Sequence, residues 1–198
     1  MPPPGEVVDL ETCARELARS QRAAATQQRI TDLKHALLEH ERSLRRAYAA
    51  ARLAVSEQRR IEPAAEWLLD NFYLVRTQLR ELAANLPVRE LRKLPRITGA
   101  GENVPRMLVI ARACVAHLDG HIEPEHARRF LAAYQDETTL RMAELWAWPG
   151  LLRMALIERI AAGARVIANR LEEYARAEYC AGYLIEMAGK DAPGMLMY

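Results

Sequence analysis

The sequence has little phenylalanine and cysteine, and these shortages exclude several classes of protein. Phe occurs only at Phe72 and Phe130, so any core must consist largely of Leu and Ala side chains. The three cysteines, Cys13, Cys114 and Cys180, lie far apart and lack the paired spacing of a disulfide framework or a zinc site. We expect them to be small apolar residues in a reducing compartment.

Long uncharged apolar runs are also missing. None approaches the ~20 residues that span a bilayer, and Met1 to Pro4 lack the basic and apolar regions of a secretory signal. We therefore expect a soluble, cytoplasmic protein. The Pro-rich residues 1–8 are expected to be a disordered tail.

Charge of one sign does not dominate. The chain has 28 basic and 26 acidic residues, a formal net charge of +2, and the two signs are interspersed. This pattern is typical of a solvated helical surface and argues against a nucleic-acid partner.

The residues that are abundant predict an all-α fold. Ala, Leu, Arg and Glu lose little freedom on a helical backbone, and the sequence shows neither period-2 alternation nor an Asn-Gly or Asp-Gly hairpin signal. We expect a multi-helix bundle over residues 9–174 with a long irregular basic loop in its middle. Residues 175–198 would form a tail, in part a frayed helix end.

The clearest predicted helix begins at Pro63, where proline loses no intrahelical hydrogen bond. Its apolar residues recur at alternating spacings of three and four, which predicts one buried seam. Pro87 ends the helix. The seam comprises Ala65, Leu68, Phe72, Val75, Leu79, Leu82 and Leu86.

Two earlier helices complete a three-helix part over residues 9–86. Asp9 can cap the first, which runs to about Gln28. The second, from about Thr31 to Arg60, has small residues in its second half that let a neighbouring helix approach closely. The short link before Pro63 requires a tight antiparallel return.

Residues 87–103 form the expected connecting loop, with a short helical turn near its start. Its cations Arg89, Arg92, Lys93 and Arg96 could bind a phosphate, because guanidinium groups match phosphate oxygens. The glycine-rich turn after a strand that holds a pyrophosphate is missing. A solvated or partner-facing loop is therefore the favoured interpretation.

The second helical part covers residues 104–174. Pro105 opens its first helix, which ends at Asp119 and Gly120 with the glycine in the left-handed cap conformation. Pro124 starts a short helix that runs to about Tyr134.

A long helix follows, with Thr138 or Thr139 as its expected cap. Pro149 and Gly150 lie inside it, and they predict a kink or a break.

One candidate metal site is the pair His117 and His121, because this spacing on an uninterrupted helix presents two imidazoles to one ion. Gly120 interrupts the helix between them, and the glutamate of a His-Glu-x-x-His motif is missing. We therefore predict no metal site, and a capping or hydrogen-bonding role for His117 and Asp119.

The tryptophans are candidates for a platform on which a sugar ring could stack. Trp67 lies in an apolar helix and Trp146 at helical spacing from Leu151, so we expect both in the core. Trp148, beside Pro149, is the one that we expect to be exposed.

Four carboxylates could pair for acid–base catalysis. On helices this rich in Arg, we expect them to form ion pairs with Arg76, Arg80 or Arg153 instead. A nucleophile constellation is missing, since the three serines lie on polar helices. The four carboxylates are Glu66, Asp70, Glu144 and Glu158.

Several blocks between about residues 30 and 160 resemble, in order and spacing, the N-terminal region of the cyclic β-1,2-glucan synthases. These are very large membrane glucosyltransferases that polymerise glucose from UDP-glucose. The blocks are PAAEWLLDNFYLV at 63–75, LPRI at 94–97, PRM at 105–107, VAHLD at 115–119, FLAAYQ at 130–135, ELWA at 144–147 and LLRMALIE at 151–158.

The resemblance implies a non-catalytic region that positions or regulates the membrane glucosyltransferase, with the growing glucan nearby. The family's Asp-x-Asp and Gln-x-x-Arg-Trp motifs are missing here, so we expect neither catalysis nor a cofactor. Family chains are much longer, which implies an N-terminal piece, a truncated product or a stand-alone relative. Its protein partner would hold the chain at the inner face of the bacterial inner membrane.

Two rival interpretations stay open: an autonomous cytoplasmic helical adaptor, and a small enzyme with its site between helices. Asp70 and Asn71 either serve a partner or bond within the chain, and we favour the internal role because Asn71 lies in a heavily apolar stretch. The residues expected to form an interface, or the local structure behind it, are Trp67, Asp70, Asn71, Tyr73, Arg106, His117, Asp119, Gln135, Glu144, Trp146 and Arg153.

Overall fold

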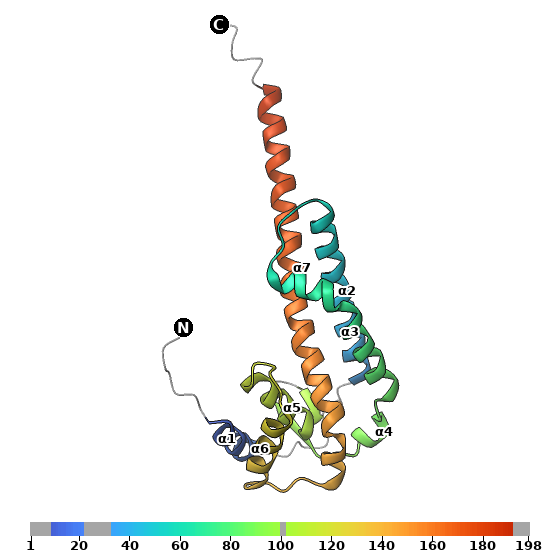
Figure 1. Ribbon diagram of the computed structural model, residues 1–198, viewed down its shortest axis with the longest axis vertical. Coiled ribbons are helices and arrows are strands. Elements are labelled where there is room, and N and C mark those ends of the chain that lie inside the picture. Colours follow the sequence, from blue (N-terminus) through green and yellow to red (C-terminus); the bar gives the residue numbers. More distant parts are fainter. Residues whose placement is uncertain (1–8, 22–32, 100–101, 192–198) are drawn as a thin grey trace. The chain divides into compact units, whose positions relative to one another are not determined.

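The computed structural model describes residues 9–21, 33–99 and 102–191, and it has an all-α fold with one small hairpin (Figure 1). The predicted fold class is confirmed. The Pro-rich residues 1–8 lie outside the described residues. In chain order the elements are α1 (Leu10–Ser20), α2 (Leu33–Ser56), α3 (Pro63–Asn85), α4 (Val88–Leu91), β1 (Arg96–Gly99), β2 (Glu102–Pro105), α5 (Arg106–His117), α6 (Pro124–Gln135) and α7 (Met142–Asp191).

The chain divides into two compact units, each of which combines two stretches of sequence. The first unit comprises residues 1–39 and 77–159, and the second comprises residues 40–76 and 160–198. Across the described ranges, no helix combines the length and the apolar composition that are needed to cross a bilayer.

In the first unit, α5 supplies the centre of the core. Met107, Leu108, Ile110, Ala111 and Cys114 are fully buried along it. α5 follows β2 directly, with Pro105 at the position before its first helical residue, as the sequence predicts.

The end of α5 also lies where the sequence places it. The φ angles of Asp119 and Gly120 are 51° and 83°, both in the left-handed region. The Gly120 N–H donates to the Val115 carbonyl at 2.9 Å, and the Asp119 N–H donates to the Ala116 carbonyl at 3.3 Å. These are the two bonds of a Schellman motif, with an aspartate at the position where glycine is more common.

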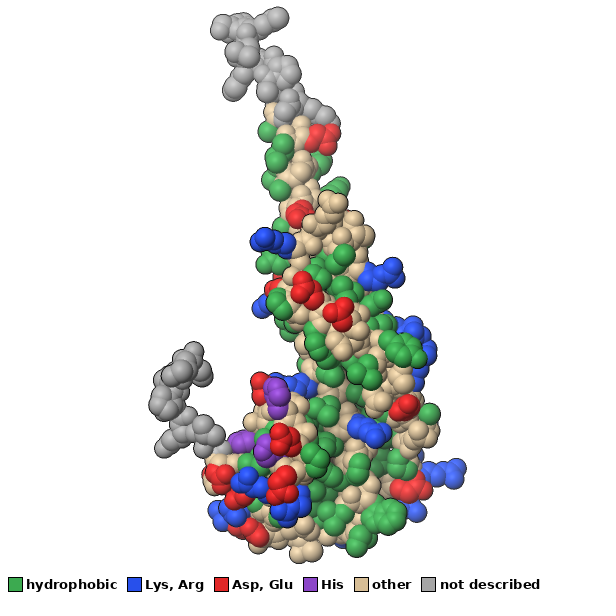
Figure 2. All heavy atoms as spheres, in the orientation of Figure 1, with side chains coloured by type: hydrophobic (Ala, Val, Ile, Leu, Met, Phe, Trp, Pro, Cys, Tyr) green, Lys and Arg blue, Asp and Glu red, His purple; other side chains and the backbone are tan. Residues whose placement is uncertain are grey.

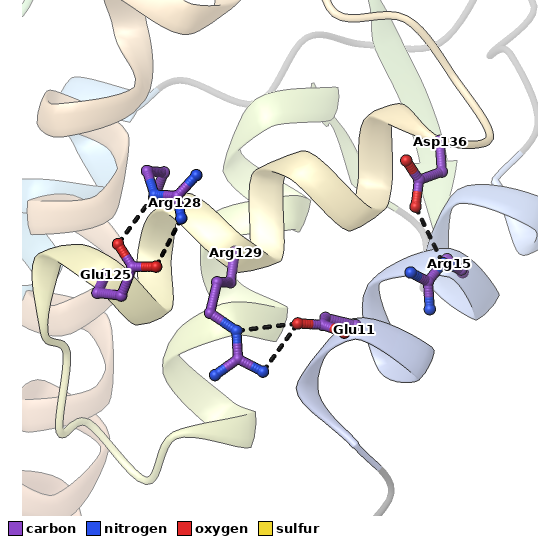
Figure 3. A network of polar contacts seen from close by, with 6 residues as sticks. All are labelled: Glu11, Arg15, Glu125, Arg128, Arg129 and Asp136. Carbon is purple, nitrogen blue, oxygen red and sulfur yellow. Dashed lines mark hydrogen bonds and ion pairs between the residues drawn. The ribbon is translucent and has the colours of Figure 1, made fainter.

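α1 packs on α6 through small apolar side chains and a set of ion pairs, and Figure 3 shows the pairs of Glu11 with Arg129 and of Arg15 with Asp136. Its buried residues are Leu10, Ala14 and Ala18, which form one narrow face. The predicted extension of this helix to Gln28 falls partly in residues 22–32, outside the described ranges. The ion pairs join Glu11 to Arg129 at 2.8 Å, Arg15 to Asp136 at 3.1 Å and Arg19 to Glu137 at 2.5 Å.

The segment 87–103, expected to be an irregular loop with a short helical turn near its start, contains that turn as α4. It also contains most of an antiparallel hairpin, which was not predicted. Arg96 in β1 pairs with Pro105 in β2, and Ile97 pairs with Val104. Ile97 and Val104 are buried and attach the hairpin to the core. Strands of four residues are too short to show an alternating pattern, which explains why the sequence did not indicate them.

The seam predicted for the helix that begins at Pro63 is confirmed in α3. Six of its members are buried, and Phe72 is half-buried, with its ring stacked on Tyr48 of α2 at a centroid distance of 4.0 Å. The six buried members are Ala65, Leu68, Val75, Leu79, Leu82 and Leu86.

In the second unit, alanines line the buried faces of α2 and α7. Arg46 of α2 donates two hydrogen bonds to Glu172 of α7, at 2.8 and 2.5 Å, so the two helices also share an ion pair. Small side chains allow helix backbones to approach closely, and the predicted small residues in the second half of α2 are buried. The buried alanines are Ala47, Ala51 and Ala54 on α2, and Ala161, Ala164 and Ala168 on α7.

The start of α7 differs from the prediction, because the helix begins at Met142 and neither Thr138 nor Thr139 caps it. Of the kink or break predicted at Pro149, a break does not occur, since the helix continues through the proline. A proline inside a helix costs roughly 3 kcal/mol. Burial of Trp148, Leu151 and Met154 around the proline offsets this cost, because the same helical face stays in the core.

Candidate functional site

An open groove in the first unit lies between α4 and the first turns of α7. It has a volume of about 520 Å³. Apart from Glu90, every side chain that lines it is apolar. The lining residues are Pro87, Glu90, Leu91, Leu94, Met142, Ala143, Trp146 and Ala147.

The α7 wall of this groove is unusually exposed for apolar side chains. Trp146 exposes 81% of its surface and Met142 exposes 69%. The α4 side is different, because Leu91 and Leu94 are buried. Large exposed apolar residues beside a groove are typical of a surface that binds another molecule, and Trp is the residue most enriched at the energetic centre of protein interfaces.

Glu144 fixes the beginning of α7 and therefore the position of this wall. Its side chain is completely buried and accepts hydrogen bonds from Arg106, at 3.0 Å from Nε and 2.6 Å from Nη2. It also accepts the backbone N–H of Arg141 at 3.0 Å. This last bond is the glutamate half of a capping box, and it satisfies a backbone donor at the helix start.

The charges at this pair stabilise each other in a partly buried setting. Burial by itself would lower the pKa of the Arg106 guanidinium, but the hydrogen bonds and charge of Glu144 outweigh burial and raise it. Burial, followed by the charge of Glu144, raises the pKa of Tyr134 against the opposing effect of Arg106. The pair is therefore a structural ion pair that holds α5 against the start of α7.

The expected exposure of the three tryptophans was wrong in each case. Trp67 exposes 49% and Trp146 exposes 81% of its surface, whereas Trp148 exposes 9%. Trp148 shares a helical face with Leu151, three residues on, while Trp146 is five residues from Leu151 and points elsewhere. Trp67 lies one residue before the seam residue Leu68 and is rotated off the seam.

The other candidates on α3 lie in the second unit and do not join the groove. Tyr73 exposes 81% of its surface, and Asp70 is exposed beside a polar hollow that Arg60 and Glu66 also line. Asn71 is half-buried, and its Nδ2 donates to the Trp67 carbonyl at 2.8 Å, within its own helix.

The remaining candidates lie at separate places in the first unit. Asp119 accepts a hydrogen bond from Arg159 Nη2, and His117 is half-buried one turn before the end of the Schellman motif. Gln135 and Arg153 are exposed. Within the parts of the chain that the structure describes, no three His, Cys, Asp or Glu side chains come together as metal ligands would.

Two of the four candidate acid–base carboxylates form ion pairs, as predicted, but their arginine partners are not the ones that we expected. Glu144 pairs with Arg106, and Glu158 pairs with Arg112 through bonds of 2.7 and 3.0 Å. Arg112 was missed because it lies 46 residues from Glu158, beyond the reach of any local spacing rule. The sequence does hold one signal for this pair, because Arg112 and Glu158 are each charged residues in a helix that is otherwise largely apolar.

Comparison with known proteins confirms the resemblance to the cyclic β-1,2-glucan synthases. No family model matches the chain. It is 34% identical over 164 residues, or 83% of its length, to cyclic β-(1,2)-glucan synthase NdvB of Rhizobium meliloti strain 1021. The match covers 6% of that synthase, so the chain corresponds to a small part of the protein that it resembles.

Proposed function

We propose that this chain is a non-catalytic helical module of cyclic β-(1,2)-glucan synthesis, which binds a membrane glucosyltransferase and positions or regulates it. The observation that most supports this function is the asymmetry of the match, which includes 83% of this chain and 6% of NdvB. A region of that size is one part of a synthase, and the glucosyl transfer belongs to the remainder. The role places the chain in the cytoplasm, at the inner face of the membrane.

The surface of the first unit supports a binding role. Trp146 and Met142 form an exposed apolar wall at the groove, which suits them to bury against another protein. Glu144 and Glu158, two of the candidate carboxylates, are already in ion pairs with arginines and so are poorly suited to acid–base catalysis.

The test uses purified NdvB from which the region matching this chain has been deleted. We expect the immobilised chain to bind this truncated synthase saturably in biolayer interferometry, and to change its rate of cyclic glucan formation. Trp146→Ala should weaken binding, while Trp67→Ala, a matched change at an exposed tryptophan of the second unit, should not. Absence of binding together with unchanged synthesis would overturn the proposal.

The exposed groove also favours a second candidate, an autonomous adaptor that binds a different protein. In both cases the chain alone should release no UDP from UDP-glucose in the presence of a divalent metal. The two candidates differ in the synthase assay, because an adaptor for another partner leaves glucan formation unchanged.

A further inference from the structure

The polar hollow beside Asp70 lies in the second unit, at the turn that joins α2 to α3 (Figure 1). It has a volume of about 660 Å³, and its walls come from the end of α2, the link and the first turns of α3. We call it the α2–α3 hollow. Its lining residues are Val55, Gln58, Arg59, Arg60, Ile61, Glu66, Leu69 and Asp70.

Backbone hydrogen bonds fix the turn that forms one wall of this hollow. Gln58 has a φ angle of 57°, in the left-handed region. Its N–H donates to the Val55 carbonyl at 3.0 Å, and the Arg59 N–H donates to the Ala54 carbonyl at 2.9 Å. These are the two bonds of a Schellman motif at the end of α2. The chain's own hydrogen bonds therefore hold this wall in place.

Three of the four charged side chains that line the hollow are free to bind a ligand. Arg59 is engaged, because its Nε lies 3.6 Å from a carboxylate oxygen of Glu178. Arg60, Glu66 and Asp70 are exposed, and their side chains form no hydrogen bond or ion pair with the residues that the structure describes. Glu66 and Asp70 are neighbours on one side of α3, since they are four residues apart on a helix.

The mixture of charges favours a neutral ligand. An anion would meet the carboxylates of Glu66 and Asp70, and a cation would meet the guanidinium groups of Arg59 and Arg60. A neutral molecule rich in hydroxyl groups can bond to both, because a hydroxyl donates to a carboxylate and accepts from an arginine. Over the part of the second unit that Figure 2 shows, acidic and basic side chains are interspersed.

An exposed aromatic ring borders the hollow and narrows the class of ligand further. Tyr73 exposes 81% of its surface and lies one helical turn beyond Leu69 and Asp70, on the same side of α3. A sugar ring has hydroxyl groups around its edge and C–H groups on its faces. The C–H groups can pack on the electron-rich face of a tyrosine, while the hydroxyls reach the charged side chains.

We propose that the α2–α3 hollow binds a neutral oligosaccharide. Hydroxyl groups of the sugar would donate to Glu66 and Asp70 and accept from Arg60, with one ring against Tyr73. The volume lies within the range of pockets that take small organic ligands. The class of ligand follows from these side chains. The choice of β-1,2-linked glucose as the sugar rests on the proposed function, because a chain that works in glucan synthesis meets this polymer.

The first test is isothermal titration calorimetry with a linear oligosaccharide of β-1,2-linked glucose. We expect saturable binding to the wild type, and affinity roughly tenfold lower for Asp70→Ala, which removes hydrogen bonds to a charged group. Tyr73→Ala should also weaken binding, whereas Tyr73→Phe keeps the ring and should retain it. The matched control is Trp67→Ala, an exposed aromatic residue of α3 that does not line the hollow.

Two results of this titration would overturn the proposal. The first is the absence of binding by linear oligosaccharides of both β-1,2-linked and β-1,4-linked glucose. The second is binding that both Asp70→Ala and Tyr73→Ala leave unchanged. Because these residues are exposed, circular dichroism should show that the variants keep the helix content of the wild type, so that a lost affinity reports on the site.

A second test asks whether the ligand is neutral. Added salt should leave the affinity for the oligosaccharide nearly unchanged, because screening acts on charged ligands. Free arginine and inorganic phosphate, as a cationic and an anionic probe of the same side chains, should not displace the oligosaccharide. Displacement by either one would show that the hollow is a site for a charged ligand.

A third test separates this site from the groove of the first unit. Asp70→Ala should bind the truncated NdvB as the wild type does, and Trp146→Ala should bind the oligosaccharide as the wild type does. Synthase binding without oligosaccharide binding would overturn the sugar site alone. Binding of the β-1,4-linked but not the β-1,2-linked oligosaccharide would support a sugar site and contradict its assignment to glucan synthesis.

Discussion

Arg106 and Glu144, 38 residues apart in the sequence, form a bidentate ion pair in which the Glu144 side chain exposes no surface. The pair connects the start of α5 to the start of α7. Because α7 carries the exposed wall of the groove, the pair sets the geometry of the surface to which we assign binding. Its role is therefore to position that surface.

Breaking this ion pair should destabilise the fold strongly. Glu144→Ala strands a largely buried guanidinium, and we expect a loss of about 3–5 kcal/mol in the free energy of unfolding. Replacing both partners with Met should cost much less, because no unpaired charge remains. Urea unfolding of the wild type, of Glu144→Ala and of the double Met variant measures these free energies of unfolding. The control is Arg153→Ala at an exposed position, which we expect within about 0.5 kcal/mol of wild type. Equal losses in the single and double variants would contradict the assignment.

Phe72 and Leu79, two members of the α3 seam, should contribute different amounts to stability. Leu79→Ala removes a fully buried side chain and should cost about 2–5 kcal/mol. Phe72 is half-buried and stacks on Tyr48, so Phe72→Ala should cost less than Leu79→Ala. Thermal melts decide the order, and a larger loss for Phe72→Ala would show that this ring is more deeply packed.

Asp70 and Asn71 should tolerate truncation to Ala. Asp70 is exposed, and Asn71 bonds to the carbonyl of Trp67 in its own helix, so neither change strands a buried partner from another element. We expect each variant to lie within about 0.5 kcal/mol of wild type. A loss above about 1 kcal/mol would point to the stranded-partner mechanism instead.

Acid should weaken the attachment of α1 to α6. The hydrogen bond from Arg19, together with its charge, holds the pKa of Glu137 below the ordinary 4.5. A lowered folded-state pKa means that the stabilisation is present above pH 4.5 and is lost as the pH falls through the lowered pKa. Glu137→Gln should therefore lower the melting temperature at neutral pH, and the difference from wild type should shrink towards pH ~3. A difference that is independent of pH would exclude this ion pair as its source.

The cysteines should differ in reactivity. Burial, followed by the nearby Cys13, raises the pKa of the Cys114 thiol to about 11, whereas Cys180 is exposed. Since the thiolate is the reactive form, iodoacetamide at mildly alkaline pH should modify Cys180 first and Cys114 only after denaturation. Peptide mass spectrometry measures both, and equal rates in the native protein would contradict the burial of Cys114.

Local patterns in the sequence account for most of the helices. The alternating spacing after Pro63, the proline before α5 and the Asp119–Gly120 end all act through neighbouring residues, and each was predictable. The continuation of α7 through Pro149 was not predictable in this way. It depends on the burial of residues on the same helical face, which a rule about the proline alone does not include.

The groove was harder to predict than the helices. It joins α4 to the first turns of α7, which lie about 50 residues later in the chain, and no local rule relates the two. Trp146 shows the difficulty, since its exposure depends on where α7 begins. That start is set by Glu144 and its distant partner Arg106.

The buried alanines of α2 and α7 determine which kinds of change the second unit can accept. Ala47, Ala51, Ala161 and Ala168 have small side chains that expose no surface. The damaging substitution is therefore one that adds volume, because an inserted methylene must push a helix away or strain a rotamer. We therefore expect side-chain size to limit substitution at these positions more than hydrophobicity does, so that even a Val or Leu would destabilise this unit.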